Sequence, residues 1–156
     1  MKKIILIILV LMLILFAGAQ LFQPEKNEGE RNIETDLFQT TMVNDSIKTL
    51  FTTSCYDCHS NSTCYPWYSK LSPISWYLYD HVKAGKEALN FSEWGNYTDN
   101  EKISQLVDIG ETVSDGEMPL KSFLIIHKEA KLSEEEIQKI VNWTEQEGMR
   151  IMEENQ

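Results

Sequence analysis

Three cysteines and one histidine lie close together in residues 54–70, which read SCYDCHSNSTCYPWYSK, and the chain has no other cysteine. Cys55, Cys58 and His59 form the pattern C-x-x-C-H. Two thiols at this spacing can form thioether bonds to the two vinyl groups of one porphyrin, and the histidine that follows is then carried under the iron as its proximal ligand. The spacing therefore predicts one covalent haem c, attached at Cys55 and Cys58 and ligated by His59.

Other chemistry is open to the same residues. A structural zinc site could use the three cysteines with His59 or His81, but no second C-x-x-C or H-x-x-x-H pair exists, and adjacent ligands suit a tetrahedral site poorly. A thioredoxin-type pair requires a strand–helix context, and a plain disulfide requires an oxidising compartment. We favour haem and keep a zinc- or disulfide-stapled binding module as the alternative. Cys64 is left over, and we expect it to pack as a small apolar side chain near the haem edge.

A methionine opposite the histidine would complete the iron coordination and suit electron transfer. Met118 is the candidate distal ligand, because it lies in the glycine–proline loop DGEMP at residues 115–119, between two predicted helices. His81 and His127 are the alternatives. His81 would give a bis-histidine haem of lower potential, whereas His127 could instead bind a propionate or a backbone carbonyl.

Aromatic side chains are concentrated after the C-x-x-C-H pattern, and they could pack against the porphyrin while keeping a polar atom for its propionates. We expect Trp67 and Trp94 to contact the haem.

The elements that must position these residues are helices. Capping signals and apolar spacing predict one helix after Asn44, one from Pro73 to Leu89, one after Thr98, and one from Glu134 to about Gln146 that begins with a Ser133–Glu136 capping box. The inward-facing residues expected on them are Ile47, Leu50, Phe51; Ile74, Tyr77, Leu78, His81, Val82; Ile103, Leu106, Val107; Ile137, Ile140 and Val141. Only residues 123–126 could form a strand, so the predicted class is all-α.

Residues 1–22 form a signal sequence or membrane anchor. Lys2 and Lys3 precede an uncharged apolar run from residue 4 to residue 22. At about 1.5 Å per residue this run just spans a hydrocarbon core of roughly 30 Å, so we favour an uncleaved N-terminal helix over a signal cleaved at Ala19. In both cases the lysines stay in the cytoplasm and the remainder is exported. The expected organisation continues with a polar tether at 23–40, a haem-binding domain at 41–147 and a polar tail at 148–156.

The chain is acidic, with a formal net charge of −10. Phosphate binding needs clustered lysine and arginine, so nucleic acid is not an expected partner. The charge would keep an exported domain soluble and is compatible with a basic redox partner.

The runs CYDCHSNSTCYPWYSKLSPISWYLYDHV, LNFSEW and GEMPLKSFLIIHKEAKLSEEEIQKIVNW occur in this order between residues 40 and 147. They resemble the bacterial haem-binding domain family of small, membrane-tethered, cytochrome c-like proteins. The resemblance implies haem c at Cys55 and Cys58 with His59 as proximal ligand. The GEMP loop is similar to the methionine-ligand loop of class I cytochromes c, and LSEEEIQKIVNW to their C-terminal helix. Cys64 stands where a polar residue is more usual in the family.

The predicted fold is thus an all-α, cytochrome c-like helical domain around a covalent haem, preceded by an N-terminal hydrophobic helix. The predicted function is that of a monohaem c-type cytochrome, anchored on the periplasmic side of a bacterial membrane, or soluble there after cleavage. It would pass single electrons between unidentified redox proteins, as a carrier rather than an enzyme, and would depend on haem-maturation machinery. The alternative is a haem-based sensor or haem enzyme with a labile sixth ligand.

Overall fold

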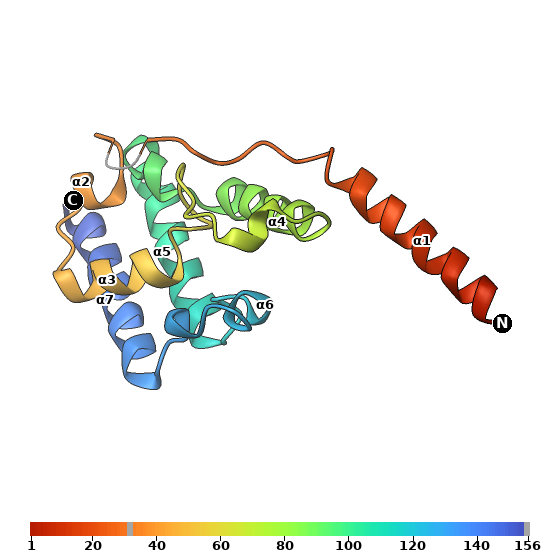
Figure 1. The fold of residues 1–156 in the computed structure, drawn as a ribbon. Coiled ribbons are helices and arrows are strands. Elements are labelled where there is room, and N and C mark those ends of the chain that lie inside the picture. The colour runs from red at the N-terminus through yellow and green to blue at the C-terminus, as the bar shows by residue number, and fades with distance from the viewer. Residues whose placement is uncertain (31–32, 155–156) are drawn as a thin grey trace.

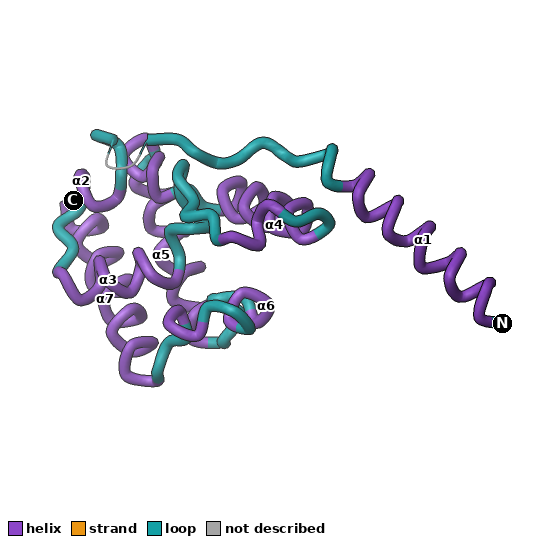
Figure 2. The backbone as a smooth tube through the Cα atoms, viewed as in Figure 1, coloured by secondary structure: helices purple, strands orange, loops and turns teal. Residues whose placement is uncertain are grey.

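The computed structural model describes residues 1–30 and 33–154, and this part of the chain is helical and contains no strand (Figures 1 and 2). The all-α prediction is confirmed. The elements are α1 (Lys2–Ala19), α2 (Leu37–Thr40), α3 (Asp45–Ser54), η1 (Trp67–Lys70), α4 (Ile74–Ala88), η2 (Phe91–Asn96), α5 (Asp99–Ser114), α6 (Lys121–Leu124), η3 (Lys128–Ala130) and α7 (Glu134–Glu154), where η marks a 3-10 helix.

Helix α1 projects from one side of the remaining helices (Figure 1), and none of its side chains is buried. It is long and apolar enough to cross a membrane, although a signal sequence would meet the same criterion. The N-terminal apolar helix is therefore present, and its length and exposure are compatible with either a membrane anchor or a signal sequence.

The core lies between α3, α5 and α7. Helices α5 and α7 run antiparallel along each other, and α3 lies against α7 (Figure 1). Phe51 of α3 meets Phe91 and Trp143 in edge-to-face contacts, with ring centroids 5.3 and 5.2 Å apart. Aromatic pairs in this geometry stabilise the fold by more than the buried area of their rings alone would provide. The CxxCH segment leaves α3 at the edge of this core.

Three predicted helix starts are confirmed. The Asn44 side chain accepts the Ile47 N–H at 3.0 Å. Thr98 and Ser133 each form a capping box with the glutamate three residues later. These caps satisfy backbone N–H groups that have no partner inside the helix.

Helix α7 continues to Glu154, beyond the predicted end near residue 146. Ile151 is buried there, and Arg150 donates two hydrogen bonds to the carboxylate of Glu147, at 2.6 and 2.9 Å. Residues 148–154 therefore form helix rather than a loose polar tail, because an apolar side chain holds this turn against the core.

Other local expectations are wrong. Residues 123–124 belong to the short helix α6, not to a strand. The segment expected as a tether contains α2, whose Leu37 is fully buried and joins the core. Val107 is exposed on α5. On α4, Val82 is buried as predicted, but Ile74 and Tyr77 are exposed, and Ser75 is buried in the first turn instead.

Candidate functional site

The C-x-x-C-H segment forms a tight turn directly after α3. The Cys55 N–H donates to the Phe51 carbonyl at 2.9 Å, and the N–H groups of Cys58 and His59 both donate to the Cys55 carbonyl at 3.1 and 3.0 Å. Because Phe51 is fully buried, the start of the turn is fixed to the core. Both thiols and the imidazole thus leave a short, hydrogen-bonded piece of backbone.

Tyr56, the first residue between the two cysteines, pins this turn to the protein. Its ring is stacked between Phe38 and Phe91, with centroids 4.6 and 5.0 Å away and planes 17° and 13° apart. Its hydroxyl donates to Asp36 Oδ1 at 3.1 Å. Burial, together with the nearby Asp36 carboxylate, raises the pKa of Tyr56 well above its usual range, so the phenol stays neutral.

The orientation of His59 is set by the segment before η2. A carbonyl oxygen can only accept, so the 3.1 Å contact between His59 Nδ1 and the Leu89 carbonyl places the proton on Nδ1. The Phe91 N–H donates to the His59 carbonyl at 2.8 Å, which holds the backbone as well. Burial lowers the pKa of His59, so the imidazole is neutral at pH 7. Its Nε2 lone pair is then the one available to a metal.

The two thiols are in their protonated form. Cys55 and Cys58 are partly buried and are not joined in a disulfide. Burial, with a smaller contribution from Cys58, raises the pKa of Cys55 to about 12. Burial and then Asp57 raise the pKa of Cys58 to about 11. A thioredoxin-type pair needs a lowered pKa, so this environment argues against thiol–disulfide chemistry.

Met118 lies in a loop that turns back onto α5. Gly116 follows the end of α5 with a φ of +67°, a conformation that glycine adopts without strain. The N–H groups of Glu117 and Met118 then both donate to the Thr112 carbonyl, at 2.9 and 3.1 Å. The Met118 side chain is partly buried and packs against the core cluster.

The two other histidines are engaged elsewhere. His127 uses Nε2 in a 2.6 Å hydrogen bond with the Tyr68 hydroxyl and Nδ1 in a 3.0 Å contact with Glu129. His81 donates through Nδ1 to the Tyr77 carbonyl, one turn earlier in its own helix, at 2.8 Å. Both ring nitrogens of His127 are therefore hydrogen-bonded in this arrangement, whereas the His81 ring bonds within its own helix.

The two tryptophans predicted as haem contacts differ sharply. Trp94 is 1% exposed and belongs to the core cluster, while Trp67 is 76% exposed and touches the ring of Tyr68 at its edge. Cys64 lies at the surface, and its N–H donates to Asp57 Oδ1 at 3.0 Å, closing the loop after the C-x-x-C-H turn. In the part of the chain that the structure describes, no three or more His, Cys, Asp or Glu side chains are grouped so that they could hold a metal ion, which leaves the zinc alternative without a ligand set.

The comparison with protein families decides between these chemistries. A family model described as a haem-binding domain matches residues 14–146. The chain belongs to this haem-binding domain family. No curated protein and no solved structure matches the chain.

The residues present in this haem-binding domain fit the cofactor that the family name implies. Two thiols and a neutral imidazole leave one turn, which is the donor set that covalent haem attachment and proximal ligation need. Bound haem would supply one-electron chemistry at its iron.

The sequence interpretation missed the residues that brace the turn of this haem-binding domain. Leu89 and Phe91 hold His59, and Asn90 Nδ2 donates to Asn61 Oδ1 at 2.9 Å. All three belong to the LNFSEW run that the family resemblance includes, which was the available signal. These three residues are apolar or carry an amide, so nothing in their types suggested contact with the histidine.

Proposed function

We propose that this protein is a monohaem c-type cytochrome whose haem is bound covalently through Cys55 and Cys58, with His59 as proximal and Met118 as distal iron ligand. It transfers single electrons between redox partners at the outer face of the cytoplasmic membrane. Helix α1 anchors it there, and haem-maturation machinery attaches the cofactor. Membership of the family supports haem binding. The covalent bonds, the two iron ligands and the transfer of electrons are what we propose beyond it.

The observation that carries the proposal is the hydrogen bond from His59 Nδ1 to the Leu89 carbonyl. It leaves Nε2 as the metal-binding nitrogen and sets the ring orientation, as second-shell carbonyls do for metal-bound histidines. Cys55 and Cys58 lie in the same turn as protonated thiols, the form that adds across a vinyl group to give a thioether.

The residues around the turn have distinct roles in this proposal. Tyr56 and Asp36 keep the backbone between the two thiols in the core. Phe91 holds the carbonyl of His59 and packs beside its ring, with centroids 6.2 Å apart. With methionine as sixth ligand no position remains open for a substrate, so the protein acts as a carrier rather than a catalyst.

The test of covalent attachment is haem staining after denaturing electrophoresis of the full chain, co-expressed with haem-maturation machinery. Wild-type protein should retain the stain, and the double variant Cys55→Ser/Cys58→Ser should lose it. Cys64→Ser is the matched control and should stain like wild type, since Cys64 lies outside the C-x-x-C-H turn. Persistent stain in the double variant would refute thioether bonds at these residues.

The reaction of the reduced protein with carbon monoxide at neutral pH tests whether the sixth coordination position is filled, as the role of an electron carrier requires. A filled sixth position should resist the gas. Rapid and complete binding would instead support the alternative of a sensor or haem enzyme with a labile ligand.

A further inference from the structure

A group of exposed aromatic and apolar side chains covers η1 and the start of α4. We call Trp67, Leu71, Ile74, Trp76 and Tyr77 the η1–α4 patch. Ile74, Trp76 and Tyr77 are 44%, 40% and 52% exposed, and Trp67 is more exposed still. A set of large apolar side chains left in water is unusual for a soluble surface and indicates an interaction site.

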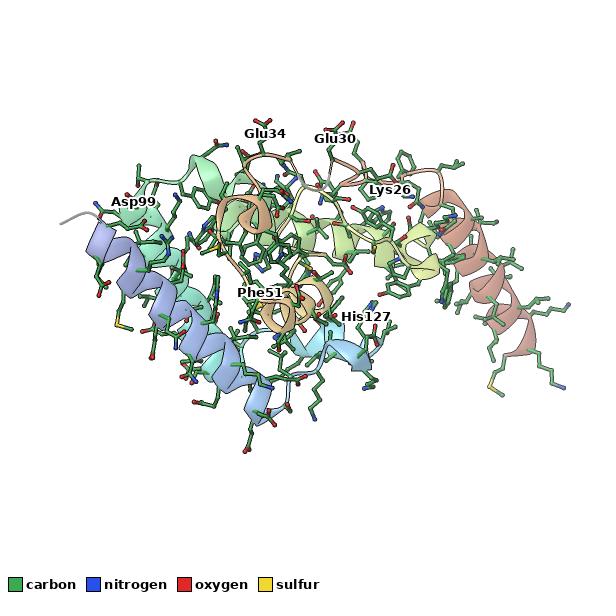
Figure 3. All side chains as sticks on the ribbon, turned by 90° about the vertical axis from the view of Figure 1, so that its left-hand side faces the viewer. Lys26, Glu30, Glu34, Phe51, Asp99 and His127 are labelled. Carbon is green, nitrogen blue, oxygen red and sulfur yellow. The ribbon has the colours of Figure 1, made fainter. Side chains whose placement is uncertain are left out.

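The patch is joined to the end of α1. Gln20 and Ser72 form a reciprocal pair, in which the Gln20 amide donates to the Ser72 carbonyl and the Ser72 N–H donates to Gln20 Oε1, both at 3.0 Å. The Trp76 indole N–H donates to the Phe22 carbonyl at 2.6 Å, and the Gln23 amide donates to Ser72 Oγ at 2.8 Å. The start of α4 lies beside the end of α1 in both views (Figures 1 and 3).

We propose that the η1–α4 patch rests in the interfacial layer of the bilayer that α1 spans. This inference rests on the proposed membrane anchoring. If α1 crosses the hydrocarbon core, Gln20 and Phe22 mark the depth at which the chain leaves it, and their hydrogen bonds hold Ser72 and Trp76 at that same depth. Tryptophan and tyrosine are enriched at this level, because their rings bury in the acyl boundary while their polar atoms stay among the headgroups.

The distribution of charged residues also favours a lipid bilayer as the partner of the η1–α4 patch. The chain carries 24 acidic residues, yet none occurs between Asp57 and Asp80, the stretch that contains the whole patch. That stretch does contain Lys70, which is exposed. The segment that carries the patch thus has no carboxylate of its own that an anionic leaflet would repel, and it offers one cation to the headgroups, while the nearby Glu25 lines a pocket with Ser69, Lys70 and Ser75.

The consequence is a fixed orientation of the haem-binding domain. A domain on a flexible tether would turn freely above the membrane. Here the anchor and the patch give two separate contacts with one bilayer, so the same face of the domain always points away from it. The α5–α7 side, with Met149 and Met152 exposed on α7, belongs to the surface that stays in water.

Photo-crosslinking from lipids tests this orientation. The full-length, haem-loaded chain is reconstituted in liposomes of phosphatidylethanolamine and phosphatidylglycerol that contain a lipid with a diazirine close to its glycerol. After irradiation, adducts are mapped by mass spectrometry. We expect adducts in residues 1–22 and in residues 67–77, and severalfold fewer in residues 149–154.

A triple variant, Trp67→Ser/Ile74→Ser/Tyr77→Ser, keeps the Trp76 hydrogen bond and should lose the adducts in residues 67–77 severalfold while keeping those in residues 1–22. Met149→Ser/Met152→Ser is the matched control and should change neither the adducts in residues 67–77 nor those in residues 1–22. Absorption of the haem and circular dichroism verify that the variants are folded.

The outcomes separate the two proposals. Adducts in residues 1–22 but none in residues 67–77 would overturn the orientation and keep the anchor, as expected if a protein partner covers the patch instead. The absence of adducts from residues 1–22 would refute the anchor, and the patch proposal would fall with it.

Discussion

Gly85 of helix α4 lies directly against the backbone of Cys58. A Cβ added at Gly85 would come within 2.8 Å of the Cys58 carbonyl oxygen, closer than such contacts occur in proteins. Helix α4 is therefore in van der Waals contact with the turn that we propose to carry the haem, and only glycine allows this approach.

Replacement of Gly85 by alanine tests that contact. Alanine alone would favour the helix by about 1 kcal/mol, but overpacking against a backbone atom costs about 1–3 kcal/mol, so we expect net destabilisation. Urea denaturation of the haem-loaded protein measures the change. Gly148→Ala is the control, because a Cβ there meets no atom within 4 Å, and this variant should be as stable as wild type or more so. Equal stability of the Gly85→Ala variant would show that α4 can move away from the turn.

Tyr56 and Asp36 make a second, removable contact with the turn. Tyr56→Phe keeps the stacked ring and removes the hydroxyl that donates to the buried Asp36, so we expect a loss of about 1–3 kcal/mol in the free energy of unfolding. Haem attachment should persist, since both cysteines remain. Tyr77→Phe on the exposed side of α4 is the control and should change stability by less than about 0.5 kcal/mol. A Tyr56→Phe variant as stable as wild type would mean that the stacking alone holds the turn.

The raised pKa of Tyr56 also predicts that the free energy of unfolding depends on pH. Its pKa is raised in the folded state, so its contribution is fully present below the pKa of the unfolded chain, about 10, and is lost as the pH rises above it. The difference in stability between wild type and Tyr56→Phe should therefore shrink between neutral pH and high pH. A difference that stays constant across this range, measured by urea denaturation at each pH, would contradict the role of the neutral phenol.

Met118→Ala tests the proposed distal ligand. Loss of the thioether sulfur should abolish the weak far-red absorption band of a methionine–iron bond and open the reduced protein to carbon monoxide. His127→Gln and His81→Gln should leave the band unchanged, since these rings bond to Tyr68, Glu129 and Tyr77. Loss of the band in a histidine variant, but not in Met118→Ala, would transfer the role to that histidine.

Local and long-range features of this fold were not equally accessible to sequence reasoning. The caps at Asn44 and Ser133 could be predicted because each joins residues three positions apart. The hydrogen bond from His59 to Leu89 spans 30 positions, and its acceptor is a backbone carbonyl that any residue type provides. The hydrogen bond from the Tyr56 hydroxyl to the Asp36 carboxylate is also long-range, because its two residues are 20 positions apart.

Helix α7 shows a different reason for error. Gly148 interrupts its apolar stripe and has a residue type that commonly follows a helix end. The helix nevertheless continues, because Ile151 reaches the core one turn later. Tertiary packing thus overrides the local propensity.

The packing of Ile151 is itself testable. Ile151→Ala should lower the free energy of unfolding by about 2–5 kcal/mol, because a buried side chain is replaced by a cavity. Met152→Ala, at an exposed position in the same turn, is the control and should stay within about 0.5 kcal/mol of wild type. Equal effects of the two substitutions would mean that Ile151 does not hold residues 148–154 against the core.

The segment between α1 and the domain provides the last prediction, through Asn27. Its side-chain amide donates to the Ser60 carbonyl and the Thr63 hydroxyl at 2.8 and 2.9 Å, and its Oδ1 accepts from Lys86 Nζ at 2.7 Å. Asn27→Ala removes all three bonds, each with a net worth of about 0.5–1.5 kcal/mol, so local opening of this segment should become at least about tenfold more frequent.

Trypsin can report that opening at Lys26, the neighbouring residue. Cleavage after Lys26 in the native full chain should accelerate in Asn27→Ala by roughly the same factor, since proteolysis follows the population of the open segment when closing is fast. Asn142→Ala, at an exposed position on α7, is the matched control and should be cleaved like wild type. If Asn27→Ala were cleaved at the same rate as wild type, the hydrogen bonds of Asn27 would not be what keeps Lys26 protected from the protease.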